Sequence, residues 1–325
     1  MDTHPHAVGD TADPRATWHD GEQALQARLG LRERMAEIGP QVVRDHMPDQ
    51  HRELFEKLPT LLLGALDADG QPWATMLAGA PGFVRTPDAR TLSAAATLDG
   101  QDPALAALRR HGAGAPVGLL GLEPHTRRRN RMNGRLRSIS DEGLAVDVVQ
   151  SFGNCPKYIQ ARDPVDWIAA PPAVARPLGA TLDDAALALI EAADTLFIAS
   201  ASAPAPGMGR SDGVDVSHRG GPPGFVRAHR RLDGGIELRV PDFPGNRFFM
   251  TLGNLLRHPR AGLLVADYAS GELLHLAAEA QLLWHGDERE LRLRVTAGLR
   301  RPGALPWRWN EARPAPQFLP ADARA

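Results

Sequence analysis

One short segment occurs twice in this chain and constrains the fold more than any other feature. The segment GAPGFVR starts at Gly79, and a near copy, GPPGFVR, starts 142 positions later at Gly221. A second pair follows in the same order, VGLLGLEP from Val117 and AGLLVADY from Ala261, 144 positions apart. Matched segments in the same order and at nearly the same offset predict a structural unit that is present twice.

The residues around both copies predict a β-rich unit. In the first half, TLLLGAL and PWATMLAG are separated by DADGQ, whose Asp-Gly pair favours a hairpin turn. In the second half, TLFIASA, GIELRVPDF and AGLLVADY have the same strand character. A unit of this kind commonly closes as a barrel, which removes exposed strand edges. Two copies in one chain then form internally the interface that single-unit proteins form by dimerising.

The 325 residues accommodate two such units. One amphipathic helix is expected from Trp18 to Gly39, where Gly39-Pro40 ends it, and Trp307 and Trp309 are expected to pack the tail onto a barrel. The predicted divisions are a disordered N-terminus (1–17), a first repeat with N-terminal helices (18–160), a Pro-rich linker (161–180), a second repeat (181–300) and a C-terminal tail (301–325).

Composition excludes several classes of function. A net charge of −2 gives no general attraction to nucleic acid. No apolar run approaches the ~18 residues of a membrane span, and the polar, acidic N-terminus does not resemble a secretion signal. The single cysteine, Cys155, permits no internal disulfide and fits a reducing, cytoplasmic location. The histidines are scattered, so no metal site is expected.

Two further features have a structural interpretation. The run HTRRRNRMNGRLR, residues 125–137, is the densest basic segment, but it lacks the aromatic residues that stack on bases. We interpret it as a solvated hairpin tip. Cys155 is expected to be buried and inert, the alternative being a redox thiol.

The two copies differ where chemistry is expected. The second copy has Ser217, His218 and Arg219 before its Gly-Pro turn, and the first copy has Thr75, Met76 and Leu77 there. Likewise, Asn246 and Arg247 precede a predicted helix in the second copy, where the first copy has Asp102 and Pro103.

Arginine, amide and free N–H groups at a helix start favour a phosphate, whereas Asp99 and Asp102 repel one. Gly220 and Gly221 allow close approach to the backbone. The pattern therefore predicts one anion site, in the second repeat. The alternative is purely structural: a bulged strand end and an exposed helix start.

At these residues the chain resembles the pyridoxamine 5'-phosphate oxidase-like superfamily of FMN-binding split barrels, in particular its tandem-repeat members. The matching stretches are PWATMLAGAPGFV, SFGNCPKYIQ, DVSHRGGPPGFV and PDFPGNRFFMTLGNLLRHPRAGLL. The resemblance implies two antiparallel Greek-key barrels of the six-stranded type with FMN between them.

By position, the resemblance assigns the phosphate to Ser217, Arg219, Asn246 and Arg247. His218 is expected near the phosphate or ribityl chain. Trp73 and Thr75 are expected at the isoalloxazine edge, and Lys157 and Tyr158 in the same cleft.

The expected function is that of an FMN-dependent oxidoreductase, with electrons from NAD(P)H or a separate reductase. One alternative is a non-catalytic carrier or sensor of a flavin nucleotide, haem or deazaflavin. Another is a scaffold whose repeats only pack on each other. The chain is expected to be a monomeric pseudo-dimer or a homodimer, and no residue stands out as a general acid or base.

Overall fold

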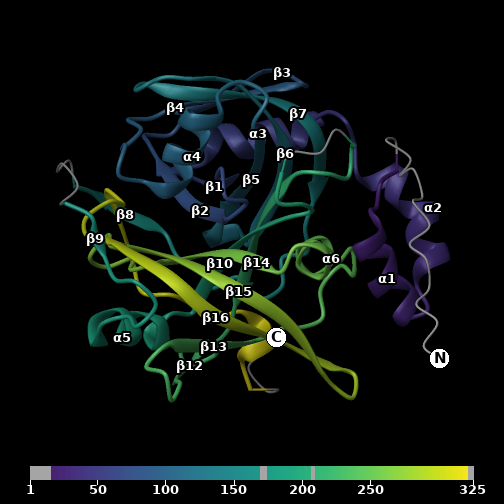
Figure 1. The fold of residues 1–325 in the computed structure, drawn as a ribbon. Coiled ribbons are helices and arrows are strands. Elements are labelled where there is room, and N and C mark those ends of the chain that lie inside the picture. The colour runs from purple at the N-terminus through teal and green to yellow at the C-terminus, as the bar shows by residue number, and fades with distance from the viewer. Residues whose placement is uncertain (1–15, 169–173, 206–208, 321–325) are drawn as a thin grey trace.

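The computed structural model describes residues 16–168, 174–205 and 209–320. It contains two large antiparallel sheets, one from each half of the chain (Figure 1). The strand order is β2-β1-β5-β6-β7-β4-β3 in the first sheet and β11-β10-β14-β15-β16-β13-β12 in the second. Each strand of the first sheet has a counterpart at the same place in the second, so the predicted duplication is confirmed.

The first half contains the strands β1 (Thr60–Leu66), β2 (Pro72–Ala78), β3 (Val84–Asp88), β4 (Thr91–Ala95), β5 (Pro116–Glu123), β6 (Arg128–Ile139) and β7 (Gly143–Gly153). Its helices are α1 (Asp20–Arg28), α2 (Arg32–Val42), α3 (Asp49–Lys57), α4 (Pro103–His111) and the 3₁₀ turn η1 (Pro124–Thr126).

The second half contains the strands β10 (Thr195–Ala201), β11 (Val214–Gly220), β12 (Arg227–Arg230), β13 (Ile236–Pro241), β14 (Arg260–Ala266), β15 (Leu273–His285) and β16 (Glu288–Arg301). Its helices are α5 (Asp184–Ala192) and α6 (Met250–Arg257). The short strands β8 (Pro164–Trp167), β9 (Arg176–Pro177) and β17 (Trp307–Trp309) and the 3₁₀ turn η2 (Pro316–Phe318) complete the chain.

The repeated Gly-Pro motif forms the same tight turn in both halves. A Cβ on Gly79 would lie 2.4 Å from Phe83, and a Cβ on Gly221 would lie 2.4 Å from Phe225. The second glycine of each motif has a positive φ, 89° in the first half and 84° in the second. Both turns therefore require glycine, and this explains why the motif is written twice.

The two barrels meet across a seam with approximate twofold symmetry. A Cβ on Gly118 of β5 would lie 2.6 Å from the carbonyl oxygen of Val214 at the start of β11. At the related place, a Cβ on Gly262 of β14 would lie 2.2 Å from the carbonyl oxygen of Pro72 at the start of β2. Each half thus presents the same surface to the other, as in a homodimer.

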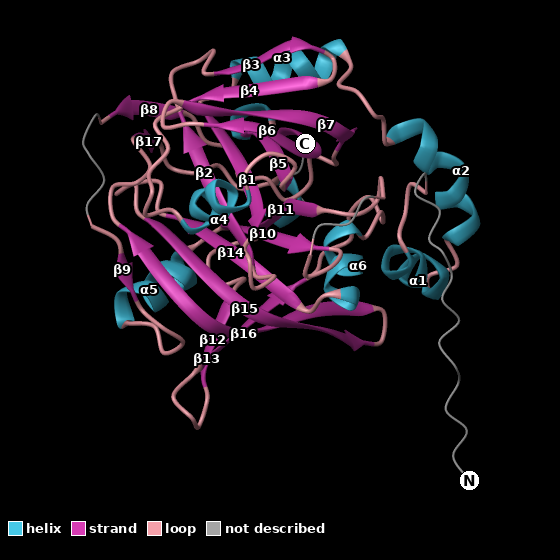
Figure 2. Ribbon diagram, turned by 45° about the horizontal axis from the view of Figure 1, so that its top comes forward, coloured by secondary structure: helices cyan, strands magenta, loops and turns pink. Residues whose placement is uncertain are grey.

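The N-terminal segment differs from the single helix expected. Gly30, with φ of 67°, ends the first helix, and a second helix continues past Pro40 to Val42. This pair of helices, α1 and α2, lies beside α6 of the second half (Figure 2). The contact is close, because a Cβ on Gly21 would lie 2.4 Å from the carbonyl oxygen of Gly253.

The expected linker and tail pair with each other and with the second barrel. β8 pairs with β17, and β9 pairs with the end of β16. Trp307 and Trp309 pack against the apolar cluster at the seam, as predicted. Residues 1–15, most of the segment expected to be disordered, lie outside the described residues, and Thr17 at its end is buried. No helix in the described ranges has the length and apolar character needed to cross a bilayer.

Candidate functional site

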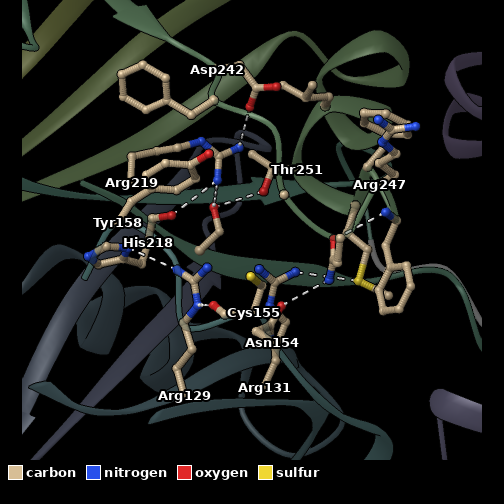
Figure 3. A pocket seen from close by; sticks show the side chains of 18 of the residues that line it. Arg129, Arg131, Asn154, Cys155, Tyr158, His218, Arg219, Asp242, Arg247 and Thr251 are labelled. Carbon is tan, nitrogen blue, oxygen red and sulfur yellow. Dashed lines mark hydrogen bonds and ion pairs between the residues drawn. The ribbon is translucent and has the colours of Figure 1, made fainter. Parts of the chain in front are cut away.

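A cleft at one end of the seam gathers side chains from both repeats (Figure 3). The first repeat contributes residues of β6 and of the segment that follows β7. The second contributes the end of β11, the loop 242–249 and the start of α6. The enclosed part of the cleft has a volume of ≈ 100 Å³, below the ~300–1,000 Å³ typical of complete small-molecule sites. The enclosed part therefore has room for only part of a nucleotide-sized molecule.

The cleft is strongly positive. Asp242 is the one carboxylate among its lining residues. Five arginines line it: Arg129, Arg131, Arg219, Arg247 and Arg289. Asp242 lies 3.4 Å from Arg219 and 2.8 Å from Arg289, and so compensates part of this charge. The excess of positive charge is the electrostatic signature of an anion-binding site.

Arg129 is fixed on the first-repeat side of the cleft. Its Nε donates to the backbone carbonyl of Cys155 at 2.8 Å, and its Nη1 donates to Nδ1 of His218 at 2.9 Å. His218 is thus the acceptor in this contact, and its ring is only 5 % exposed. Burial, followed by repulsion from Arg129 and Arg219, holds the pKa of His218 well below its usual value, so this ring is neutral at physiological pH.

Arg131 and Arg219 approach the same hollow from opposite repeats (Figure 3). Arg131 pairs with buried Asp215 at 3.1 Å, and Nη1 of Arg219 lies 3.4 Å from the Ser217 hydroxyl. The Nε atoms of both arginines are buried and have no hydrogen-bond partner among the described residues.

The crowding of these arginines affects the pKa values of Arg129 and Arg219. Burial, together with the nearby Arg131 and Arg219, lowers the pKa of Arg129 to about 9. Burial also lowers the pKa of Arg219, and its neighbour Arg131 acts in the same direction. An anion in this cleft would offset the repulsion between these arginines.

The start of α6 adds free donors to the arginines. The helix begins after Phe249 and has no side-chain cap. Arg247 and Phe249 both have a φ of 63°, the left-handed conformation that non-glycine residues rarely adopt. Thr251 in the first turn donates from its hydroxyl to that of Ser217 at 2.9 Å. The uncapped N–H groups and the helix dipole favour an anion at this place.

The N-terminal helices support this strained loop. The Trp18 ring lies 5.1 Å from the Phe248 ring, and the Gln26 amide donates to the Phe248 carbonyl at 3.4 Å. Both Trp18 and Gln26 are buried. The loop 242–249 is therefore packed against the N-terminal segment, which is not part of either barrel.

Aromatic rings form a second group in the lining. The five are Phe152, Tyr158, Phe243, Phe248 and Phe249. Tyr158 and Phe243 lie 5.2 Å apart, and Phe318 from the C-terminal segment contacts both, at 5.7 Å and 5.5 Å between ring centroids. Only 5 % of the chain is aromatic, so the gathering of rings beside five arginines points to a ligand with both an anionic group and a planar ring.

Most of the residues predicted from the sequence lie in this cleft. Its lining includes Ser217, His218, Arg219, Gly220, Asn246, Arg247 and Tyr158. Asn246 and Arg247 are exposed and lie at its rim. Gly220 sits against the backbone of Tyr158, where a Cβ would lie 1.9 Å from the carbonyl oxygen. This glycine is therefore required for packing of the two repeats rather than for approach of a ligand.

Three predicted residues are not part of the cleft. Lys157 is exposed and does not line it. Trp73 donates from its indole to Asp67, and Thr75 is fully buried and donates to Asp102. Thr75 is the counterpart of Ser217, and the approximate twofold symmetry places counterparts at opposite ends of the seam, so it cannot face the same cavity.

The sequence pattern indicated Tyr158 on the first-repeat side of the cleft but not the residues of β6. The basic run is not a hairpin tip, because most of it forms β6, and Arg129 and Arg131 line the cleft. The spacing of two between these arginines was the available signal, since alternate residues of a strand share a face. Cys155, expected to be buried, is partly exposed and lines the cleft.

The related place at the other end of the seam is filled by side chains. Arg301, at the end of β16, donates to Asp102 at 2.5 Å and to Asp99 at 2.6 Å. Asp102 also accepts from Thr75 and caps α4 through the N–H groups of the first helical turn. His275 lies beside Arg301, with its Nε2 3.5 Å from Nη1 of the guanidinium.

The chain was compared with known proteins. The family model for pyridoxamine 5'-phosphate oxidase matches residues 47–177. No curated protein is similar enough in sequence to match. Similar solved structures include HupZ of Group A Streptococcus, with 13 % identity over 33 % of this chain and 93 % of that chain and a TM-score of 0.26.

Two further solved structures are similar. The haem storage protein HutZ of Vibrio cholerae has 14 % identity over 38 % of this chain and 95 % of its own, with a TM-score of 0.25. An F420 reductase has 12 % identity over 34 % of this chain and 97 % of its own, with a TM-score of 0.23.

Proposed function

Because the chain is a pyridoxamine 5'-phosphate oxidase-like split-barrel protein, we propose that its cleft binds FMN and that the protein is an FMN-dependent oxidoreductase. The observation that carries the proposal is the gathering of five arginines and five aromatic rings around one cavity between the repeats. A phosphate joined to a planar ring system is the ligand that satisfies both sets.

The residues present fit the phosphate of such a ligand. Arg219, the hydroxyls of Ser217 and Thr251, and the uncapped start of α6 would hold it, and Arg129 and Arg131 would add charge from the other repeat. Tyr158 and Phe243 offer ring faces for the isoalloxazine. The flavin, when bound, supplies hydride or electron transfer, and the protein supplies binding and a positive field.

The arrangement of the donors favours FMN over haem. Haem carries two separate propionates, whereas Arg219, the Ser217 hydroxyl and Thr251 meet at the uncapped start of α6, which suits a single phosphate group. The lining residue types alone do not separate the two cofactors, because Cys155, Tyr158, His218 and Met250 are all of types that can bind a haem iron.

A non-catalytic flavin carrier is the second candidate. The titratable side chains of the lining are largely engaged in contacts within the protein. His218 accepts from Arg129, Asp242 pairs with two arginines, and the Tyr158 hydroxyl donates to the carbonyl of Pro244 at 3.0 Å. Apart from Cys155, whose thiol also lines the cleft, these acids and bases are thereby engaged, which favours a carrier or a reaction of hydride transfer alone.

Titration with FMN, followed by flavin fluorescence, tests the binding. Arg129→Ala should weaken FMN binding by about 1.5–3 kcal/mol, roughly ten- to a hundredfold, because it removes a half-buried charged donor. Arg128→Ala is the matched control, since Arg128 is the exposed neighbour on the same strand. Equal affinity of the two variants would refute the assignment. Bleaching of the bound flavin by NADH or NADPH then separates an enzyme from a carrier.

A further inference from the structure

A second and larger cavity lies apart from the arginine cleft. It has a volume of ≈ 840 Å³, within the range of complete small-molecule sites. Its walls come from α5, from the segment that follows β7, from the turn after β14 and from the C-terminal residues 309–318. Phe318 is among its lining residues and also contacts Tyr158 of the arginine cleft.

One wall of this cavity holds a guanidinium in a fixed position. Arg162 is 5 % exposed, pairs with Asp194, and lies with its guanidinium carbon 3.9 Å from the centre of the Tyr268 ring. A guanidinium carries five N–H groups. Within the described part of the chain, the side chain of Arg162 makes one hydrogen bond, to Asp194. Its Nε is buried without a partner. Arg162 therefore has hydrogen-bonding capacity that the protein itself does not use.

Aromatic and apolar surfaces surround this donor. Tyr268 and Trp309 pack edge to face with centroids 5.7 Å apart, and the indole N–H of Trp309 has no partner among the described residues. Leu189 and two alanines of α5 contribute an apolar wall. Unused donors beside aromatic faces suit a planar ring that carries a hydrogen-bond acceptor.

The charge of this cavity is opposite to that of the arginine cleft. Arg162 and Arg300 are its two cations, and its four carboxylates are Asp194, Asp267, Glu272 and Glu311. Asp194 pairs with Arg162 and Glu272 pairs with Arg300. The two remaining carboxylates give the lining an excess of negative charge, which disfavours an anionic ligand.

We propose that this second cavity binds an uncharged aromatic molecule bearing a carbonyl or amide group, whose oxygen accepts from Arg162 while its ring packs on Tyr268 and Trp309. This proposal does not depend on FMN in the arginine cleft. The molecule then has two sites that differ in charge preference, one for an anion and one for an uncharged ring.

A matched pair of probes tests the ligand class. 2-Naphthamide and 2-naphthoate have nearly the same shape and differ in charge. Titration calorimetry of the full chain, with saturating inorganic phosphate to occupy the arginine cleft, should show naphthamide binding at least about tenfold more tightly than naphthoate. No detectable binding of naphthamide, or equal affinity for both probes, overturns the proposal.

Two variants locate the binding. Leu189→Trp fills the cavity and should reduce naphthamide affinity about tenfold or more, whereas Leu256→Trp, on the exposed face of α6 and outside both cavities, should leave it unchanged. Trp309→Phe keeps a ring but reduces the aromatic face on which the naphthalene packs, so a loss of about threefold or more is expected even if Leu189→Trp does not fold. Naphthamide affinity that is unchanged in both Leu189→Trp and Trp309→Phe would show that the probe binds elsewhere.

Discussion

The two ends of the seam start from the same architecture and differ in what fills them. At the open end, Ser217 and Thr251 share a hydrogen bond beside the uncapped α6, and the arginines around them lack sufficient carboxylates. At the closed end, Thr75 and Asp102 share the corresponding hydrogen bond, and Asp102 caps α4. At the closed end the polar side chains pair with one another, whereas at the open end donors remain available for a ligand.

Arg301 is the residue that completes the closed end. Arg301 on β16 pairs with Leu273 on β15. In the first sheet, Arg129 corresponds to Leu273, and its neighbour Asn154 corresponds to Arg301. A cation therefore stands between two aspartates at one end, and a neutral amide stands among arginines at the other. In the closed cleft, the Asp102 carboxylate takes the place of an anion at the start of α4, and Arg301 neutralises that carboxylate.

Removing that cation is the largest perturbation of the comparison. Arg301→Ala leaves Asp99 and Asp102 without their partner, and Asp102 is only 1 % exposed. Breaking a buried pair from one side costs about 3–5 kcal/mol, so the free energy of unfolding should fall by about that amount in urea denaturation. FMN affinity of the folded variant should be unchanged, because the open cleft is not touched.

Arg294→Ala is the control on the same strand. Arg294 and its partner Glu279 are both more than half exposed, and an exposed pair contributes less than about 1 kcal/mol. If the two variants lost equal stability, the closed cleft would not be the buried ion cluster described above. If Arg301→Ala lost FMN affinity in proportion to stability, the two ends would be coupled rather than independent.

The next test introduces a carboxylate at the open end, as Asp102 provides one at the closed end. Thr251→Asp introduces a negative charge in the first turn of α6, beside Ser217 and the arginines. The new carboxylate competes with phosphate for the same donors, so FMN affinity should fall by about 3 kcal/mol, on the order of a hundredfold. The melting temperature of the ligand-free protein should rise, since the same carboxylate compensates the helix dipole and the cations.

Thr251→Ser is the control for Thr251→Asp, because it changes the side chain without introducing a charge. It keeps the hydroxyl that donates to Ser217 and should bind FMN nearly as well as the natural protein. Thr251→Asp binding FMN with unaltered affinity would show that the phosphate is held elsewhere. A lower melting temperature in Thr251→Asp would show that the open cleft does not carry uncompensated positive charge.

The sequence could predict the duplication because its signal is local. The Gly-Pro turn needs glycine at two places for steric reasons that hold in any context, so both copies retain it. The position of Ser217 and Arg219 in the cleft could be predicted for the same reason, because they lie on a strand whose end the turn fixes; their role as cofactor ligands stays a prediction. Here the local pattern and the tertiary structure agree.

The remaining half of the cleft depends on the packing of the repeats, which local patterns do not encode. Arg129 and Arg131 belong to the basic segment 125–137, and a segment of this composition is predicted to be exposed to solvent. They line the cleft because β6 contacts β11 of the other repeat. Thr75 was misplaced for the opposite reason: its equivalence to Ser217 is correct, but symmetry separates equivalent residues instead of bringing them together.

Substitution of Arg247 at the open end should have the smallest effect on FMN binding. The sequence suggested that this arginine is a principal phosphate ligand, and the structure places it, exposed, at the rim of the cleft, with no ion pair among the described residues. An exposed charge near a bound dianion contributes less than a buried one because water screens it, so Arg247→Ala should weaken FMN binding by about 1 kcal/mol or less at low salt. The effect should fade as ionic strength rises from about 0.05 to 0.5 M, whereas the loss in Arg129→Ala should persist. Calorimetric titrations of both variants at the two salt concentrations measure this, and a salt-resistant loss in Arg247→Ala would mean that the loop closes over the phosphate when FMN binds.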